Sequence, residues 1–398
     1  MEELFLFQNK ILNSISDNFY RSQFNDIDWS QRLLGIKGLR GVGKTTILLQ
    51  YLKFKKPKAV TALYVTADHP WFYSHSLFEL VSEFSKNGGQ LLLIDEIHKY
   101  PNWARELKAA YDGNPDIQFV FTASSAFDIF KAEGDLSRRA FVEILPGLSF
   151  REYLEFRHDL KVKKISLSEL LNAGDEISKE LNQIFKPIPL FKEYIHSGYF
   201  PFLKNETSAS TTKKLMAVVN TVLENDLAVV EDYSPSNIQK VKKLLGVIAG
   251  SAPFTPNITS IAQKLNVGRN TIYNFLKHLE DARILNLIHK RGRGVSVLQK
   301  PDKIYFENTN LALSLHSDAQ TGALRETFFL NQLRNAGHTV ELPKKADFLV
   351  DEHWVFEIGG ENKTARQIRN IENAWLVKDN IEYATPNTLP LWMFGLLY

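Results

Sequence analysis

The chain has 398 residues, of which 44% are hydrophobic and 23% are charged, as in ordinary soluble globular proteins. Its formal net charge of +3 excludes a polybasic binder, so any contact with nucleic acid has to be local. The absence of cysteine excludes disulfides, thiolate metal sites and a cysteine nucleophile. No apolar run approaches the length of a membrane span, and the first residues lack a basic leader pattern, so a cytoplasmic protein is expected.

Strand and helix patterns alternate over residues 1–150 and predict a first α/β domain. Continuous apolar strands between helices are typical of a parallel sheet that is covered on both faces. A leading helix is expected over 5–20. The expected strands are 33–37, 60–65, 90–94, 116–122 and 141–145, with helices over 71–85 and 103–111 among them.

The segment after the first expected strand reads G-x-x-x-x-G-K-T, the phosphate-binding loop of P-loop NTPases. Its glycines let the backbone turn N–H groups inward, and the helix that follows adds the positive end of its dipole. We expect Lys44 to reach the β- and γ-phosphates of ATP, and the Thr45 hydroxyl to bind Mg²⁺. The residues expected to surround the nucleotide are Gly38, Leu39, Arg40, Gly41, Val42, Gly43, Lys44, Thr45 and Thr46.

A second nucleotide motif follows about fifty residues downstream, where four apolar residues precede Asp95 and Glu96. The apolar run places Asp95 at the end of a buried strand, where its carboxylate suits Mg²⁺. Glu96 is then expected to orient or deprotonate the water that attacks the γ-phosphate. Ser124, after the next strand, is either a contact to the γ-phosphate or part of an ordinary polar turn. Arg139 either neutralises phosphate charge, in its own or a neighbouring subunit, or belongs to a solvated pair with Arg138.

The rest of the chain predicts three further parts. Residues 151–240 are expected to form a helical lid or connector, and residues 241–315 a winged helix-turn-helix. In the latter, helices over 260–267 and from residue 269 precede a hairpin over 285–298 with a basic tip. Residues 316–398 are expected to form a small α/β domain, with helices over 322–336 and 363–371 and strands over 339–342, 346–350 and 353–358.

The winged helix pattern offers two functions. Between residues 260 and 303 there are nine Lys or Arg against three Asp or Glu, which suits contacts with the phosphates of double-stranded DNA. Winged helices also dock onto proteins, and the apolar residues of the second helix belong to a core. The candidate DNA-binding residues are Arg269, Asn270, Lys277, Lys290, Arg291 and Arg293.

The chain resembles a prokaryotic family of AAA-type ATP-binding proteins. Members join a P-loop ATPase domain to a winged helix and to a C-terminal domain of unknown function that is similar to PD-(D/E)XK nucleases. The resemblance spans nearly the whole chain and implies binding of ATP with Mg²⁺. It is carried by residues 38–46, 91–98, 121–125, 136–139, 148–153, 198–201, 303–306 and 356–360, and by Trp103 with Lys108. Many members have Gly-Ser-Ser where this chain has Ala123-Ser124-Ser125, and Gly-Arg where it has Arg138-Arg139. Arg139 is therefore the arginine that aligns with the family pattern.

The nuclease-like resemblance implies that Glu326, Asp347 and Glu357 surround a divalent metal. In such nucleases a lysine follows two residues after the last carboxylate. Here that position is Gly359, although Lys363 is near in sequence. Because a lysine in that position helps to activate the attacking water, nuclease activity is not expected, and structural roles for Asp347 and Glu357 are favoured.

These features predict an Mg²⁺-dependent ATPase that acts as a nucleotide switch, coupled to DNA or to a protein through the winged helix. Two alternatives remain: a DNA-binding protein regulated by ATP without significant turnover, and a metal-dependent nuclease with an atypical site. The sequence leaves the partner and the oligomeric state open.

Overall fold

The computed structural model describes residues 1–125, 136–227, 233–250, 253–290 and 300–398. It divides into two compact units, Met1–Gly147 and Leu148–Tyr398. The first unit spans nearly the same residues as the first α/β domain expected over 1–150. The second contains all three segments for which separate domains are expected. None of the helices in the described ranges is both long and apolar enough to span a membrane.

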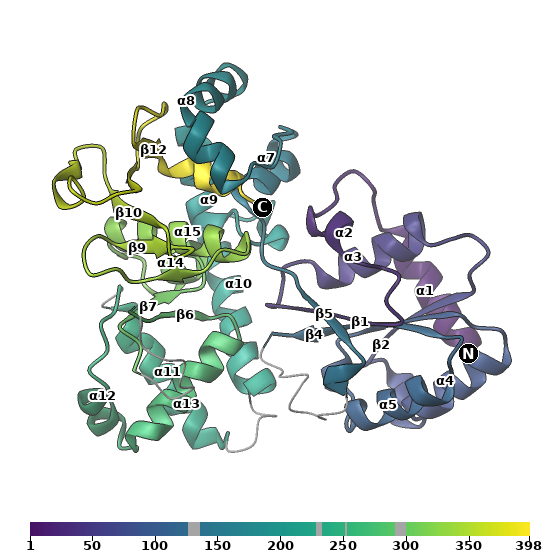
Figure 1. The fold of residues 1–398 in the computed structure, drawn as a ribbon. Coiled ribbons are helices and arrows are strands. Elements are labelled where there is room, and N and C mark those ends of the chain that lie inside the picture. Colours follow the sequence, from purple (N-terminus) through teal and green to yellow (C-terminus); the bar gives the residue numbers. More distant parts are fainter. Residues whose placement is uncertain (126–135, 228–232, 251–252, 291–299) are drawn as a thin grey trace. The chain divides into compact units, whose positions relative to one another are not determined.

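The first unit is built on a parallel sheet of five strands in the order β2-β3-β4-β1-β5, which confirms the expected α/β architecture. Helix α3 covers one face of the sheet, and α4 and α5 cover the other (Figure 1). The strands are β1 (Leu33–Gly38), β2 (Ala62–Thr66), β3 (Leu91–Asp95), β4 (Gln118–Ser124) and β5 (Phe141–Ile144). The helices are α1 (Glu2–Asn13), α2 (Gln23–Asp26), α3 (Lys44–Gln50, continued by a π-helical turn, Tyr51–Lys55), α4 (Leu77–Lys86) and α5 (Trp103–Gly113), with 3-10 turns at Pro70–Tyr73, Ile97–Lys99 and Leu136–Arg138.

Two expected helices of this unit differ from the structure because polar side chains bond to the nearby backbone. The leading helix ends at Asn13, where the Ser14 hydroxyl donates to the Ile11 carbonyl. The helix expected over 71–85 is split. Ser76 accepts a hydrogen bond from the Glu79 amide, and the Glu79 carboxylate accepts one from the Ser76 amide, so α4 begins after this capping box.

The second unit begins with helices and ends with a mixed five-stranded sheet in the order β12-β11-β10-β9-β8. One hydrophobic core contains side chains from Phe150 in the first helix to Leu397 near the end of the last turn. The helices are α7 (Phe150–His158), α8 (Leu167–Ile184), α9 (Pro187–Ser197), α10 (Ser208–Thr221, continued by a π-helical turn, Val222–Asp226), α11 (Pro235–Ala249), α12 (Ile258–Leu265), α13 (Arg269–Asp281), α14 (Thr309–Leu315) and α15 (Thr321–Asn335). The strands are β6 (Leu285–Ile288), β7 (Lys303–Phe306), β8 (Val340–Glu341), β9 (Phe348–Val350), β10 (Trp354–Gly359), β11 (Ala374–Lys378) and β12 (Thr388–Pro390), with 3-10 turns at Pro201–Leu203, Ala365–Gln367 and Leu391–Leu396.

Two features of this unit correct or limit the expectations. The helix expected over 363–371 is wrong, because only Ala365–Gln367 forms a helical turn. The apolar spacing there reflects packing of Ile368 and Ile371 in a small cluster with Leu349 and Leu376 of the sheet. Strand β6 pairs antiparallel with β7, whereas the expected hairpin strand at 295–298 lies outside the described residues.

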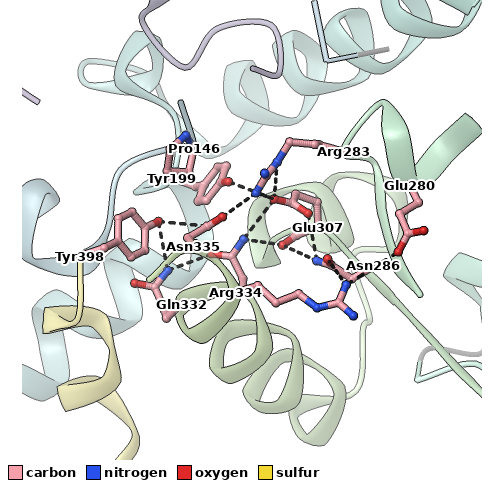
Figure 2. Close-up of polar contacts among 12 residues, drawn as sticks. Pro146, Tyr199, Glu280, Arg283, Asn286, Glu307, Gln332, Arg334, Asn335 and Tyr398 are labelled. Carbon is pink, nitrogen blue, oxygen red and sulfur yellow. Dashed lines mark hydrogen bonds and ion pairs between the residues drawn. The ribbon is translucent and has the colours of Figure 1, made fainter. Parts of the chain in front are cut away.

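A buried polar network joins the segment after α13 to β7 and α15 (Figure 2). The Glu307 carboxylate, 3% exposed, accepts from Arg283 Nη2 (2.5 Å) and from Asn286 Nδ2 (2.9 Å). Arg283 also donates to Asn335 Oδ1 (2.5 Å), and Arg334 Nη1 donates to Asn286 Oδ1 (2.9 Å). Because leaving one partner of a buried ion pair uncompensated is strongly destabilising, this network holds the segments in one mutual arrangement.

Candidate nucleotide-binding site

The phosphate loop, residues 38–45, connects β1 to α3 in the first unit. Gly41 and Gly43 have φ angles of 84° and 101°, in the left-handed region that glycine adopts without strain. Gly43 is also the N-cap residue of α3 and offers no side chain to accept from the first helical amides. The loop is therefore a nest of backbone N–H groups at a helix start, which is suited to phosphate oxygens.

Lys44 is the first residue of α3 and is 7% exposed. Its Nζ donates to the carbonyl oxygens of Gly38 (2.8 Å) and Leu39 (3.2 Å), so the ammonium lies across the loop. An ammonium held within the loop is placed to exchange these carbonyl acceptors for phosphate oxygens.

Asp95 ends β3 and is 4% exposed. Three hydroxyls donate to its carboxylate: Thr45 Oγ1 to Oδ2 (2.7 Å), the Tyr64 hydroxyl to Oδ2 (3.0 Å) and Thr122 Oγ1 to Oδ1 (2.5 Å). Burial and then the neighbouring Asp95 raise the pKa of Tyr64, so its phenol keeps its proton and remains a donor. All groups gathered here bind through oxygen, the ligand atom that Mg²⁺ prefers.

The strand order explains why these hydroxyls meet. Strand β4 lies between β1 and β3, and β2 lies on the far side of β3. Because the strands are parallel, their carboxyl ends meet at one edge, which brings Thr122 and Asp95 together. The register also pairs Gly38, the first glycine of the loop, with Ser124. Ser124 is thus beside the start of the phosphate loop, and its amide donates to His98 Nδ1 (3.3 Å).

Glu96 follows Asp95 in the left-handed backbone region, with φ 49° and ψ 44°. Its amide donates to Thr122 Oγ1 (2.8 Å), and its carboxylate forms ion pairs with Arg40 (3.5 Å) and with Lys99. Lys99 also contacts Asp68 (2.5 Å). Burial opposes the charge of Lys99, but hydrogen bonds to Asp68 and Glu96 raise the pKa of Lys99 above its usual range. Glu96 is therefore held by two cations in this conformation.

Arg139 follows the 3-10 turn Leu136–Arg138. Its Nε and Nη2 donate to the two carboxylate oxygens of Asp112 in α5, at 2.9 and 3.1 Å. The structure thus brings Arg139 to Asp112 and shows no contact between Arg139 and Asp95 among the interactions of the described residues.

Four of the residues expected to contact DNA are described: Arg269, Asn270 and Lys277 on α13, and Lys290 two residues after β6. Arg269 and Asn270 are exposed at the start of α13, and Arg269 lines an open hollow of about 640 Å³ with the α12–α13 turn. Lys277 pairs with Asp281 (2.6 Å) and Lys290 with Asp302 (3.9 Å). Arg291 and Arg293 lie outside the described residues.

The nuclease-like residues of the second unit are engaged in contacts with neighbouring groups. Lys363 Nζ pairs with Glu357 Oε1 (2.5 Å), and the Ile358 amide donates to Asp347 (2.8 Å). Glu326 accepts from the Tyr305 hydroxyl (2.5 Å). Across the described parts of both units, no three His, Asp or Glu side chains gather as a group able to hold a metal ion.

Sequence reasoning missed three residues that contact the acids of the site: Tyr64, Lys99 and Thr122. The sequence pattern could have indicated Thr122, since it places a hydroxyl near the carboxyl end of an otherwise apolar strand. It could not have indicated Tyr64, because an aromatic residue in a strand is ordinary core.

Two segments of the chain match known protein families, and the first of them lies mostly in the first unit. Residues 30–154 match the family model described as "AAA domain" (AAA_14), and residues 188–321 match a "Domain of unknown function" (DUF8612). A curated relative, the "Uncharacterized protein MJ1637" of Methanocaldococcus jannaschii, is 26% identical and is matched over 85% of this chain and 77% of its own length. The chain therefore contains an AAA-type domain, and both the phosphate loop and Asp95 lie within it.

The solved structures that the chain matches share little sequence with it. The S. cerevisiae Hsp104–ADP complex is matched over 69% of this chain, with 14% identity and a TM-score of 0.32. This chain covers only 41% of the Hsp104 chain, less than two thirds of its length. AMPPCP-bound DnaA from Aquifex aeolicus is matched over 69% of this chain and 87% of that chain, with 14% identity and a TM-score of 0.26.

Proposed function

We propose that the first unit binds ATP with Mg²⁺ and hydrolyses it, and that the protein acts as a nucleotide switch. The observation that supports this most is the 2.7 Å hydrogen bond between Thr45 of the phosphate loop and Asp95 of β3. It joins the phosphate loop, in which Lys44 directly precedes Thr45, to the carboxyl end of β3.

In this proposal each motif residue has one role. The loop amides and Lys44 bind the β- and γ-phosphates. Thr45 and Asp95 hold the Mg²⁺, which when bound neutralises charge on the phosphate oxygens. Glu96 orients the attacking water and takes its proton. For that role the Glu96 carboxylate has to give up its ion pair with Lys99 and accept a hydrogen bond from the water instead.

Two more residues have proposed roles. Ser124 contacts the γ-phosphate, since it is paired in register with the first glycine of the loop. Arg139 stabilises the charge that develops on the phosphate. It acts either on the nucleotide of its own subunit, after release from Asp112, or on the nucleotide of a neighbouring subunit in an oligomer.

The test compares wild type with Glu96→Gln, Lys44→Ala and the control Glu3→Gln, an exposed glutamate of α1. Phosphate release and Mg·ATP affinity are measured for each. Glu96→Gln should keep the affinity of wild type and lose turnover by at least about 100-fold, because the amide keeps the size of the side chain but cannot take a proton from water. Lys44→Ala should weaken binding by at least about tenfold. Wild-type turnover in Glu96→Gln would remove Glu96 from its role, and a wild type that binds neither Mg·ATP nor Mg·GTP would refute the proposal.

A second proposed function is contact with double-stranded DNA through a winged helix formed by α11–α13, β6 and β7. The observation that favours it is the exposure of Arg269 and Asn270 at the start of α13, next to the open hollow. A protein partner on the same face is the alternative.

Salt titration of duplex binding separates these two partners. Arg269→Ala should reduce the slope of log affinity against log salt by about one, since one phosphate contact is lost. Lys277→Ala should leave the slope unchanged, because Lys277 is already paired with Asp281. Wild-type slopes in Arg269→Ala would argue against contact with DNA at this helix, and ATP turnover measured with and without DNA tests the coupling.

A further inference from the structure

Arg21 lies just before α2, outside every motif, and is 5% exposed. Its guanidinium donates to three backbone carbonyls that are far apart in the sequence. Nη1 donates to the Val42 oxygen (2.7 Å), and Nη2 donates to the oxygens of Pro146 (2.9 Å) and Gly147 (2.8 Å). One buried side chain thus joins the phosphate loop to the last residues of the first unit.

The contact with Val42 determines which way a loop amide points. In a trans peptide the carbonyl of one residue and the N–H of the next lie on opposite sides of the chain. Anchoring the Val42 oxygen on Arg21 therefore turns the Gly43 N–H to the opposite side, at a residue with φ 101°. Because glycine by itself adopts many conformations, an external anchor keeps this amide aimed in one direction.

The contacts with Pro146 and Gly147 involve what we call the exit segment, residues 145–147, through which the chain continues to the second unit. The Leu145 amide donates to the Lys37 carbonyl (2.7 Å) at the end of β1. A Cβ on Gly38 would lie only 2.5 Å from the Leu145 oxygen, so the exit segment packs directly on the first glycine of the loop. A shift of the loop backbone at Gly38 therefore has to displace the exit segment.

We propose that Arg21 is a positioning residue that holds the phosphate loop ready for phosphate and couples nucleotide binding to the exit segment. This inference rests on the proposed function, since it requires that the loop binds a nucleotide. It adds the route by which the nucleotide state reaches the segment that leads to the second unit.

The test uses Arg21→Met with Arg32→Met as a matched control. Arg32 also donates to two backbone carbonyls, those of Tyr111 (3.2 Å) and Asn114 (3.5 Å), away from the loop. Two quantities are measured: the affinity for Mg·ADP, and the amide hydrogen exchange of the exit segment with and without Mg·ADP. We expect Arg21→Met to bind at least about tenfold more weakly than Arg32→Met, because charge-assisted hydrogen bonds are lost.

Hydrogen exchange distinguishes positioning from a structural role. In wild type and in Arg32→Met, Mg·ADP should slow exchange in the exit segment. In Arg21→Met at saturating Mg·ADP the change should be absent, whatever the variant's melting temperature. Arg21→Lys keeps the charge but loses the fork of donors, so its change in exchange on binding Mg·ADP should lie between those of wild type and Arg21→Met.

Each other outcome overturns a defined claim. Equal affinities and equal exchange changes in Arg21→Met and Arg32→Met would overturn the inference alone. So would a wild type that binds Mg·ADP with no change at the exit segment, which decides the matter even if Arg21→Met does not fold. A folded wild type that binds no nucleotide would refute the proposed function and this inference with it.

Discussion

Replacing Thr122 by Val tests the hydroxyl that connects the two acids of the candidate site. Thr122 is fully buried in β4. Its Oγ1 donates to Asp95 Oδ1 (2.5 Å) and accepts from the Glu96 amide (2.8 Å). Valine has nearly the same shape, so the substitution removes these two hydrogen bonds with little change in packing.

The expected cost follows from those two bonds. A hydrogen bond to a charged group contributes about 1.5–3 kcal/mol, and an amide left buried without an acceptor costs about 1–3 kcal/mol. The two contributions sum to about 2.5–6 kcal/mol. We expect a value near the lower end, about 3 kcal/mol of the free energy of unfolding of the first unit, because Asp95 keeps its hydrogen bonds to Thr45 and Tyr64. For a unit of this size, each kcal/mol lowers the melting temperature by roughly 2–4 °C, so a decrease of roughly 6–12 °C is expected. Turnover should fall by about 10- to 100-fold, because the Glu96 backbone loses its anchor.

The assay is thermal unfolding with and without Mg·ATP, combined with phosphate release. The transition that rises with Mg·ATP identifies the first unit, because a ligand stabilises only the unit that it binds. Thr61→Val is the control, since Thr61 is exposed just before β2 and its loss should cost less than about 0.5 kcal/mol. If Thr122→Val melts within about 2 °C of this control and keeps wild-type turnover, Thr122 does not hold the two acids as argued.

Three further predictions concern the second unit. Gly359→Ala should cost about 1–3 kcal/mol in urea unfolding, because the new Cβ would lie 2.4 Å from the Lys363 Cβ; no loss would contradict this contact. Gly246→Ala should instead stabilise by about 0.5–1 kcal/mol, since Gly246 is exposed within α11 and nothing lies within 4 Å of its added Cβ; destabilisation would contradict this. Burial, opposed in part by Lys303, raises the pKa of Glu326 in the folded state. A raised folded pKa means stability that is present below the unfolded pKa of about 4.3 and is lost as pH rises through the folded value. The melting temperature of Glu326→Gln relative to wild type should therefore increase as pH rises above the unfolded pKa of about 4.3; an exposed control, Glu176→Gln, should show no such trend, and a flat difference for Glu326→Gln would refute the argument.

The order and type of most elements could be read from local patterns. The five strands of the first unit were expected from apolar runs, and all five are present. The contact between Thr45 and Asp95 follows from the two motifs, since one places Thr45 at the start of the helix after β1 and the other places Asp95 at the carboxyl end of β3. Local patterns failed where a short irregular crossover carried the apolar spacing of a helix, as at residues 363–371.

Contacts that depend on strand order were out of reach. Nothing in the local pattern of β4 says that it lies between β1 and β3, and this position alone brings Thr122 to Asp95. Arg21 is 125 residues from Pro146 in the sequence, and no periodicity links them. The same holds for the contact between Lys99 and Asp68, which lie 31 residues apart and after different strands, whereas Glu96 is a local partner three residues before Lys99.

Read alone, the chain already specifies a loop that can accept phosphate and an acid that can bind magnesium, because glycine, lysine and aspartate carry that chemistry wherever they are placed. Folding settles which hydroxyls, cations and carbonyls surround those groups. The reason is physical: side-chain chemistry and backbone preference act over a few residues, whereas the neighbours of a buried carboxylate or guanidinium depend on how strands distant in sequence pair and pack.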